Sequence, residues 1–343
     1  MFELEKLVRK NILSLKPYSS ARDDFKGNAS VYLDANENPY GTLYNRYPDP
    51  HQNKLKQKIS ALKKIPINQI FLGNGSDEPI DLMIRAFCEP GIDNILIPQP
   101  TYGMYTVSAE INNVSIKAVT LTADFDLDVE AIKGTWDSHT KLIFLCSPNN
   151  PSGNLLSTDK IIQILQKFKG VVIVDEAYID FTNLPGFISM LNQYSNLVIL
   201  QTLSKAWALA AIRVGMCFAS PEIIAILNKI KPPYNISILS QTAAEEGLDN
   251  ESAKNEWVLK IIAERKNLEK ELQKIKIVKK LYPSDANFLL VKIVRAKDVY
   301  LKLVERGVIV RDRSNVILCE DCLRITVGTP EENRALINEL NAI

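Results

Sequence analysis

The chain has 343 residues, of which 46% are hydrophobic and 24% are charged, and these are ordinary values for a globular protein with a sizeable core. The 41 lysines and arginines nearly balance the 40 aspartates and glutamates. Because they are spread along the chain, neither a nucleic-acid-binding surface nor an acidic tail is indicated. At roughly 150 residues per domain, the length predicts two domains.

Charges interrupt residues 1–22 every few positions, unlike the apolar core of a signal peptide. No apolar run approaches the roughly 18 residues needed to span a membrane. We therefore expect a soluble, cytoplasmic protein without a membrane partner. The odd number of cysteines, five, favours reduced thiols over a disulfide framework.

Short apolar runs alternate with longer amphipathic stretches in the first two thirds of the chain. Runs that are apolar at successive positions are typical of strands buried on both faces, and so of a mostly parallel sheet. Amphipathic helices are predicted over 79–88 and 158–168. The expected fold class is α/β, with helices covering the sheet. The runs are "QIFLG" (69–73), "NILIP" (94–98), "KLIFLC" (141–146), "VVIVD" (171–175) and "LVILQ" (197–201).

The last third of the chain has a different pattern. A long charged helix is predicted over 250–276, and strand-like runs with intervening helices follow at 287–293, 307–312 and 322–328. This order predicts a smaller α+β domain.

The expected organisation has three parts. Residues 1–40 form an N-terminal arm that we expect to pack near the smaller domain. Residues 41–240 form the larger domain, and residues 241–343 form the smaller one.

Cys319 and Cys322 form a single CxxC pair. A zinc site needs about four ligands, a second pair is missing, and His51 and His139 are distant in the sequence. A redox pair normally opens a helix, whereas this pair precedes a strand-like run. A hairpin turn with two incidental cysteines is therefore favoured over a metal or redox site.

Polar residues follow the apolar runs, and ligands of open α/β sheets bind beyond the carboxyl ends of the strands. Ser76 and Asp77 follow the first run and open a helix with Pro79 in its first turn. The start of a helix can bind an anion, although serine or aspartate there also serves as an ordinary N-cap. Tyr102 follows the second run and could stack on a flat ligand or simply pack. Asn150 follows the third in a Pro/Gly turn, where a purely structural role competes.

Asp175 ends the fourth run, where a buried carboxylate needs a cationic or protonated partner, and Tyr178 lies three residues further on. Lys205 follows the fifth run in "QTLSKAWALAAIRVG". A surface lysine is the common interpretation of such a residue, and an amine nucleophile that forms a Schiff base is the alternative.

These side chains are expected at one edge of one sheet. An amine, a buried carboxylate, hydrogen-bond donors, a stacking aromatic and an anion site suit pyridoxal 5′-phosphate. Its aldehyde reacts with lysine, its ring nitrogen needs a carboxylate, and its phosphate takes a helix start, hydroxyls and an arginine.

Nearly the whole chain resembles the fold-type I aminotransferases that use pyridoxal 5′-phosphate, and among them the histidinol-phosphate aminotransferase family. The resemblance implies a large domain with a mostly parallel central sheet and a smaller α+β domain. The motifs that carry it are "LKPYSSAR" (15–22), "LDANENPYG" (33–41), "NRYPDP" (45–50), "GNGSDE" (73–78), "SPNNPSG" (147–153), "DEAY" (175–178), "TLSKAWALAAIRVG" (202–215), "VRD" (310–312) and "LRITVGT" (323–329).

The resemblance implies a role for each cofactor-binding residue. Lys205 is the Schiff-base lysine and proton shuttle, Asp175 pairs with the ring nitrogen, and Tyr102 stacks on the ring. Asn150 and Tyr178 hold the phenolic oxygen. The cofactor phosphate is surrounded by Ser76, Asp77, Thr202, Ser204, Arg213 and, from the partner subunit of a homodimer, Tyr47.

The resemblance also implies the substrates. Arg324 grips substrate anions, and Arg311, Tyr18, Asn36 and Tyr234 belong to the substrate site. The implied reaction, in histidine biosynthesis, is transamination of L-histidinol phosphate with 2-oxoglutarate to imidazole acetol phosphate and L-glutamate. Aromatic-amino-acid aminotransferases and threonine-phosphate decarboxylases share the cofactor motifs and are the alternatives.

Overall fold

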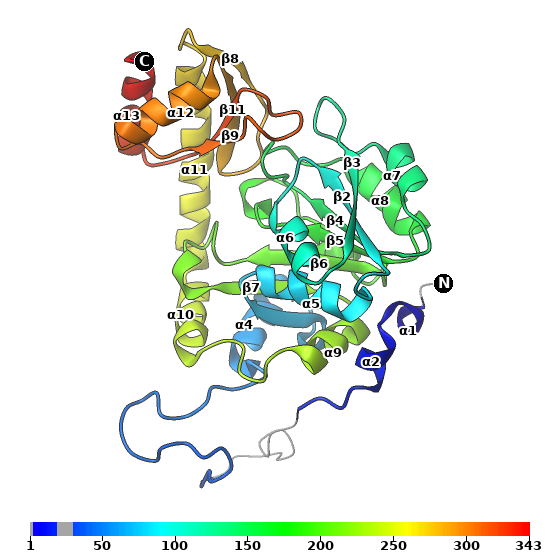
Figure 1. Cartoon of the computed structure of the whole chain (residues 1–343). Helices are drawn as coiled ribbons and strands as arrows, with labels where there is room; N and C mark the ends of the chain where they lie inside the picture. The colour runs from blue at the N-terminus through cyan, green and yellow to red at the C-terminus, as the bar shows by residue number, and fades with distance from the viewer. Residues whose placement is uncertain (1–2, 19–29) are drawn as a thin grey trace.

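The computed structural model describes residues 3–18 and 30–343. The described chain folds around two β-sheets, and the smaller sheet lies at one end of the molecule beyond the larger one (Figure 1). The larger sheet has the strand order β1-β7-β6-β5-β4-β2-β3. Its strands are β1 (Ile70–Asn74), β2 (Asn94–Gln99), β3 (Ser115–Thr120), β4 (Thr140–Cys146), β5 (Val171–Asp175), β6 (Leu197–Thr202) and β7 (Val214–Phe218).

The central strands β2 to β6 are parallel, which confirms the predicted mostly parallel sheet. β7 runs antiparallel to both β6 and β1, so β1 points the same way as β6 and ends at the same edge. Neither β3 nor β7 was predicted. β3 lies at the edge of the sheet with only Val119 buried, so it lacks an apolar run. β7 is buried throughout, but Gly215 breaks its apolar pattern.

Helices cover both faces of the larger sheet. Successive residues of β5 belong to the two different cores on these faces. Val172 and Val174 of β5 belong to the core on one face, with α4, α7, α8 and α10. Val171 and Ile173 belong to the core on the other face, with α5, α6 and α9. Burial on both faces explains the continuous apolar runs of these strands. The helices are α4 (Asn53–Lys63), α5 (Asp77–Phe87), α6 (Met104–Ile111), α7 (Val129–Thr135), α8 (Thr158–Lys167), α9 (Pro221–Ile230) and α10 (Ile238–Leu248).

The smaller unit packs its own core between a four-stranded sheet and three helices. The long helix α11 runs from the larger unit into it (Figure 1). The predicted run 307–312 forms strand only at its end, because Gly307 with φ +77° closes the preceding helix. The strand order is β10-β11-β9-β8. The elements are α11 (Glu251–Leu272), β8 (Val278–Leu281), β9 (Phe288–Ile293), α12 (Ala296–Glu305), β10 (Arg311–Asp312), β11 (Cys322–Thr326) and α13 (Pro330–Asn341).

The change from one core to the other falls between α10 and α11. Ala244 and Leu248 of α10 pack in the core of the larger sheet, whereas Leu268 and Leu272 of α11 pack in the smaller core. The larger unit therefore extends about one helix beyond the predicted boundary at residue 240.

The described part of the N-terminal arm lies against the larger unit and not, as expected, near the smaller one (Figure 1). Its short helices α1 (Leu4–Leu7) and α2 (Lys10–Ser14) flank Val8, which is buried in the core that α5 and α9 share. Arg9 pairs with Glu89 at 3.1 Å, and its backbone N–H donates to the carbonyl of Ala86. Apolar burial and one ion pair thus hold the segment beside α5.

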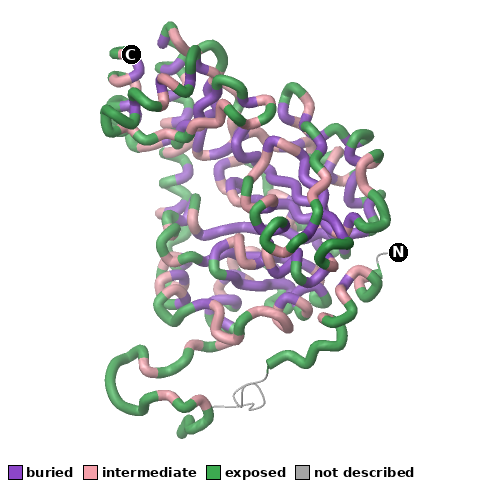
Figure 2. The backbone as a smooth tube through the Cα atoms, viewed as in Figure 1, coloured by how far each residue is buried: buried purple, intermediate pink, exposed green. Residues whose placement is uncertain are grey.

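Residues 30–50 leave this body as an extended, mostly exposed segment, drawn green in Figure 2. Among the described residues, no helix is long and apolar enough to cross a membrane.

Candidate functional site

A pocket opens at the carboxyl ends of β1, β2, β4, β5 and β6, where the sequence predicted a ligand. Each strand contributes its last residue or residues that follow it, and Arg213 precedes β7. The lining side chains include every predicted cofactor-binding residue except Tyr47: Ser76, Asp77, Tyr102, Asn150, Asp175, Tyr178, Thr202, Ser204, Lys205 and Arg213. The parallel order of the sheet is what brings residues so distant in sequence to one edge.

Asp175 lies at the floor of the pocket and is 2% exposed. Its Oδ2 accepts a 2.6 Å hydrogen bond from the Tyr105 hydroxyl, and its Oδ1 accepts one of 3.1 Å from the Ala177 N–H. Burial raises the pKa of the Asp175 carboxyl, and these hydrogen bonds only partly offset it. A protonated ring nitrogen would supply the positive charge that this carboxylate lacks.

Asn150 and Tyr178 lie side by side and are both buried. The Asn150 Nδ2 lies 3.5 Å from the Tyr178 hydroxyl, and the Asn150 Oδ1 accepts a 2.6 Å hydrogen bond from Arg324 Nη1. Burial raises the pKa of Tyr178, so its hydroxyl keeps its proton and can donate. Asn150 therefore joins the larger unit to an arginine of the smaller one.

The turn between β1 and α5 forms a candidate anion site. Gly75 adopts φ +72°, which lets the chain turn sharply before Ser76, the N-cap residue of α5. The Ser76 side chain makes no capping hydrogen bond, so its hydroxyl is not engaged as an ordinary cap. The helix start offers unpaired N–H groups, and Arg213 reaches the same place, with its Nη2 at 3.6 Å from Asp77 Oδ2.

The hydroxyls of Thr202 and Ser204 complete this anion site. Thr202 Oγ1 accepts from the Ser204 N–H at 3.1 Å, and Ser204 Oγ lies 3.5 Å from Arg213 Nη1. Tyr102 also lines the pocket. Its hydroxyl donates to Asp77 Oδ1 at 3.1 Å, and its half-buried ring meets Tyr105 edge-on at 5.5 Å between centroids.

Lys205 projects from the turn after β6 and is exposed at the mouth of the pocket. Its Nζ lies 5.7 Å from the centre of the Tyr178 ring. Partial loss of water around the side chain lowers the pKa of Lys205, and the positive charges of Arg324 and Arg213 lower it further. The unprotonated amine is therefore more accessible than that of an ordinary surface lysine.

A second pocket adjoins the first, and Tyr102, Asn150, Tyr178 and Lys205 line both. The smaller unit contributes three arginines to it, namely Arg311, Arg313 and Arg324. Arg311 of β10 lies opposite Arg324 of β11 in the antiparallel register. The Arg324 guanidinium also lies 5.3 Å from the centre of the Phe288 ring.

Residues 29–340 match the family "Aminotransferase class I and II". A protein of Cytophaga hutchinsonii named histidinol-phosphate aminotransferase is 58% identical over 343 residues, with 99% of each chain covered. The crystal structure of the histidinol-phosphate aminotransferase from Clostridium acetobutylicum has a TM-score of 0.80 at 29% identity and covers 87% of this chain and 90% of that one. The chain belongs to the histidinol-phosphate aminotransferase family.

One further structure supports the aminotransferase fold. The histidinol-phosphate aminotransferase from Sinorhizobium meliloti, in complex with pyridoxal-5′-phosphate, has a TM-score of 0.80 at 22% identity and covers 87% of this chain and 82% of that one. Together with the family match, it confirms the fold-type I architecture predicted from the motifs.

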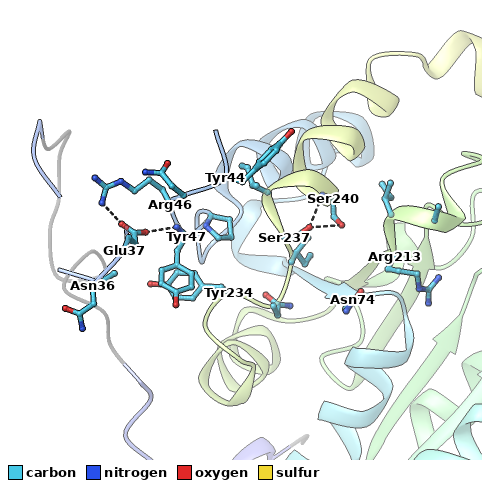
Figure 3. A pocket seen from close by; sticks show the side chains of 18 residues that line it. Asn36, Glu37, Tyr44, Arg46, Tyr47, Asn74, Arg213, Tyr234, Ser237 and Ser240 are labelled. Carbon is cyan, nitrogen blue, oxygen red and sulfur yellow. Dashed lines mark hydrogen bonds and ion pairs between the residues drawn. The ribbon is translucent and has the colours of Figure 1, made fainter. Parts of the chain in front are cut away.

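The remaining predicted residues of this aminotransferase lie outside the two pockets. Asn36, Tyr47 and Tyr234 line a third pocket, in which the rings of Tyr47 and Tyr234 stack at 4.4 Å and 11°. Figure 3 shows the stacked rings at one end of this pocket and Arg213 at the other. Tyr18 borders a groove between the N-terminal arm and α9. Residues 19–22 of its motif lie outside the described residues.

The sequence did not reveal three features of the aminotransferase site. Tyr105 lies inside α6, where its spacing reads as ordinary core, although its hydroxyl binds Asp175. Cys146, the last residue of β4, faces the first pocket. Arg313 lies two residues after Arg311, and this period-2 spacing was the available signal that both arginines share a face.

Cys319 and Cys322 form a turn into β11, as predicted, with the Cys322 N–H donating to the Cys319 carbonyl. All five cysteines are free and buried. No group of three or more histidine, cysteine, aspartate or glutamate side chains within residues 3–18 and 30–343 could hold a metal ion.

Proposed function

We propose that the chain transfers the amino group of L-histidinol phosphate to 2-oxoglutarate, giving imidazole acetol phosphate and L-glutamate. The observation that carries the proposal is the junction of the two pockets. Lys205 and Asp175 lie among strand-end side chains suited to a cofactor, and three arginines suited to an anionic substrate border the same lysine. Identity of 58% to a protein named for this reaction supports the substrate.

Pyridoxal 5′-phosphate is the cofactor that the first pocket fits. Asp175 is buried, its pKa is raised, and it makes no ion pair with any described residue, so a protonated ring nitrogen matches it. Asn150 and Tyr178 would hold the phenolic oxygen, and Tyr102 would lie against the ring. The phosphate would be held at the start of α5 by Ser76, Asp77, Thr202, Ser204 and Arg213.

The bound cofactor supplies an aldehyde that accepts the amino group and a protonated ring that takes up the electrons released with the α-proton. Lys205 Nζ would take that proton from the substrate carbon and hold it beside the reacting atoms for its return. The lowered pKa of Lys205 favours the unprotonated amine needed for this step. Asp175 would hold the ring nitrogen and favour its protonated form.

Arg324 would bind the phosphate of one substrate and the carboxylate of the other in alternation. A guanidinium suits both anions because its fork of N–H groups matches two oxygens at once. The Asn150 Oδ1 accepts from Arg324 Nη1, which fixes the fork beside the cofactor pocket and leaves its other N–H groups for the ligand.

We also infer a homodimer in which Tyr47 reaches the cofactor phosphate of the partner subunit. The segment that carries Tyr47 is extended, and it exposes several large apolar side chains, including Leu33 at 89% and Leu43 at 92%. Such surface is typical of a contact with a second copy. The pocket of Tyr47 also ends at Arg213, beside the predicted phosphate site.

The absorption spectrum of the purified protein loaded with pyridoxal 5′-phosphate tests the function. L-Histidinol phosphate alone should convert the bound aldehyde form to the amine form, and 2-oxoglutarate should restore the first spectrum. Borohydride reduction followed by peptide mass analysis should find the cofactor on Lys205. A spectrum that L-histidinol phosphate leaves unchanged would refute the substrate, and release of carbon dioxide would favour a decarboxylase.

A further inference from the structure

The pocket of the smaller unit is unusually rich in positive charge. Arg311, Arg313, Arg324 and Lys205 line it, and no aspartate or glutamate is among its lining residues. Within residues 3–18 and 30–343, none of the three arginines forms an ion pair with a protein carboxylate. The pocket therefore holds more positive charge than a single carboxylate would balance.

The hairpin of β10 and β11 gives Arg313 its direction. Arg311 lies opposite Arg324, and the Arg313 N–H donates to the Cys322 carbonyl at 2.9 Å, which continues the pairing by one residue. Because side chains alternate along a strand, Arg311 and Arg313 share a face and Asp312 points to the other. The Asp312 carboxylate instead accepts from the Ser314 N–H at 2.8 Å.

The three guanidiniums influence one another. Arg313 is half-buried, and the loss of water lowers its pKa, with further lowering by the positive charges of Arg324 and Arg311. Like charges held together in partly desolvated surroundings repel. An anion bound among them removes this repulsion, and one of charge −2 removes more than one of charge −1. A phosphate monoester reaches −2 above its second pKa of about 6, whereas a carboxylate stops at −1.

We propose that Arg313 is a specificity-determining residue that favours the phosphate-bearing substrate over a substrate bound through a carboxylate. The inference deepens the proposed function and rests on it. Arg324 holds either anion, and Arg313 adds a contact that the phosphate uses and the carboxylate does not. Arg313 therefore sets the ratio of the two affinities and has no part in the proton transfer.

The experiment compares half-reactions of the cofactor-loaded protein followed by absorption. Arg313→Gln keeps a long polar side chain without the charge. The concentration of L-histidinol phosphate that gives half the maximal rate should rise by roughly ten- to a hundredfold, the size expected for one charge-assisted hydrogen bond. The concentration of L-glutamate that gives half the maximal rate should rise less than about threefold. Arg313→Lys should recover part of the loss, because it restores the charge but not the fork.

A pH series separates this role from a structural one. Wild type and Arg313→Gln should differ less in their half-saturating concentration of L-histidinol phosphate as the pH falls toward 5. At that pH the charge of the phosphate monoester falls to −1. Arg334→Gln is the matched control, since Arg334 is an exposed arginine of α13 paired with Glu331. It should leave the half-saturating concentrations of both substrates unchanged. The inference would be overturned if the half-saturating concentrations of both substrates rose equally in Arg313→Gln, or if that of L-histidinol phosphate did not change. A wild-type protein unresponsive to L-histidinol phosphate would instead overturn the proposed function.

Discussion

At the residue scale, the proposed function depends on the charge of one carboxylate, that of Asp175. In Asp175→Asn, the amide oxygen can still accept from the Tyr105 hydroxyl, and only the weaker hydrogen bond from the Ala177 N–H is lost, so the pocket should still bind pyridoxal 5′-phosphate. The neutral amide cannot hold a proton on the ring nitrogen, and removal of the α-proton should slow by roughly a hundredfold or more. Stopped-flow absorption with L-histidinol phosphate measures the rate, and equilibrium dialysis measures cofactor retention. An unchanged rate would mean that the carboxylate is structural.

The sequence could predict those site residues that follow buried strands. Asp175 ends an apolar run, Lys205 and Asn150 each follow one, and a parallel sheet brings such positions together. Tyr105 could not be found in this way, because its hydroxyl meets Asp175 only through the packing of α6 on the sheet. Tyr47 also depends on long-range geometry, since the exposed segment that carries it has no pattern that fixes its direction.

At the scale of elements, the close approach of β7 to the turn before α5 shapes the proposed phosphate site. A Cβ on Gly215 would lie 2.3 Å from the carbonyl carbon of Gly75 and from the nitrogen of Ser76. Gly215→Ala must therefore push the turn away. We expect at least about tenfold weaker binding of pyridoxal 5′-phosphate and a loss of roughly 1–3 kcal/mol of folding free energy.

Fluorescence titration with the cofactor and urea denaturation measure these two effects. Gly134→Ala is the control, because Gly134 lies in α7 and a Cβ there meets no atom within 4 Å. That variant should bind the cofactor normally and gain up to about 1 kcal/mol from better helix propensity. Normal cofactor binding by Gly215→Ala would show that the turn can move without harm.

Glu176 ties together the ends of β5 and β6 and the loop before Phe187. It is buried and accepts hydrogen bonds from the Phe187 N–H and from Gln201 Nε2. Burial raises the pKa of its carboxyl from 4.5 to about 7. The folded chain then keeps a proton that the unfolded chain has lost, so stability should fall as pH rises from about 4.5 to about 7 and then level off.

Glu176→Gln should remove this contribution, which at about 1.4 kcal/mol per pKa unit is on the order of 3 kcal/mol above pH 7. The Gln201 Oε1, which is buried without a partner, can accept from the new amide if the Gln201 side chain turns over. Urea denaturation between pH 5 and pH 8 should show the wild type losing stability relative to the variant. Parallel curves for the two proteins would contradict the assignment.

The strands could be predicted from the sequence where their burial requires a run of apolar residues. The strands of the parallel centre are apolar at nearly every position, so they were found. β3 is an edge strand with one buried residue, and β8, at the edge of the smaller sheet, has none. Neither requires an apolar run, and their pairing is decided by the neighbouring strand.

For the whole molecule, the inferred dimer makes a prediction that a monomer cannot satisfy. Tyr47→Ala alone should weaken the binding of the cofactor phosphate by roughly tenfold, as expected for one hydrogen bond to a charged group. A hybrid of one Lys205→Ala chain and one Tyr47→Ala chain should contain one intact site, because the first chain lends its Tyr47 to the lysine of the second. That site should bind the cofactor with wild-type affinity.

Co-expression with two affinity tags isolates the hybrid, and cofactor titration of its activity gives the affinity. A hybrid of Lys205→Ala with wild type is the matched control and should behave identically. If Tyr47 served its own chain, the active site of the hybrid would retain the weakened affinity of Tyr47→Ala.

The hairpin of β10 and β11 supplies all three arginines of the substrate pocket, whereas the larger sheet supplies the lysine and the carboxylate. In the proposed function, the arginines that bind the substrate anion therefore lie in a different stretch of the sequence from the residues that carry out the proton transfer. On this proposal, mutations confined to residues 311–324 should change which amino donor is accepted and leave Lys205 and Asp175 in place. For laboratory evolution, this stretch is the compact target at which to diversify the enzyme toward new donors.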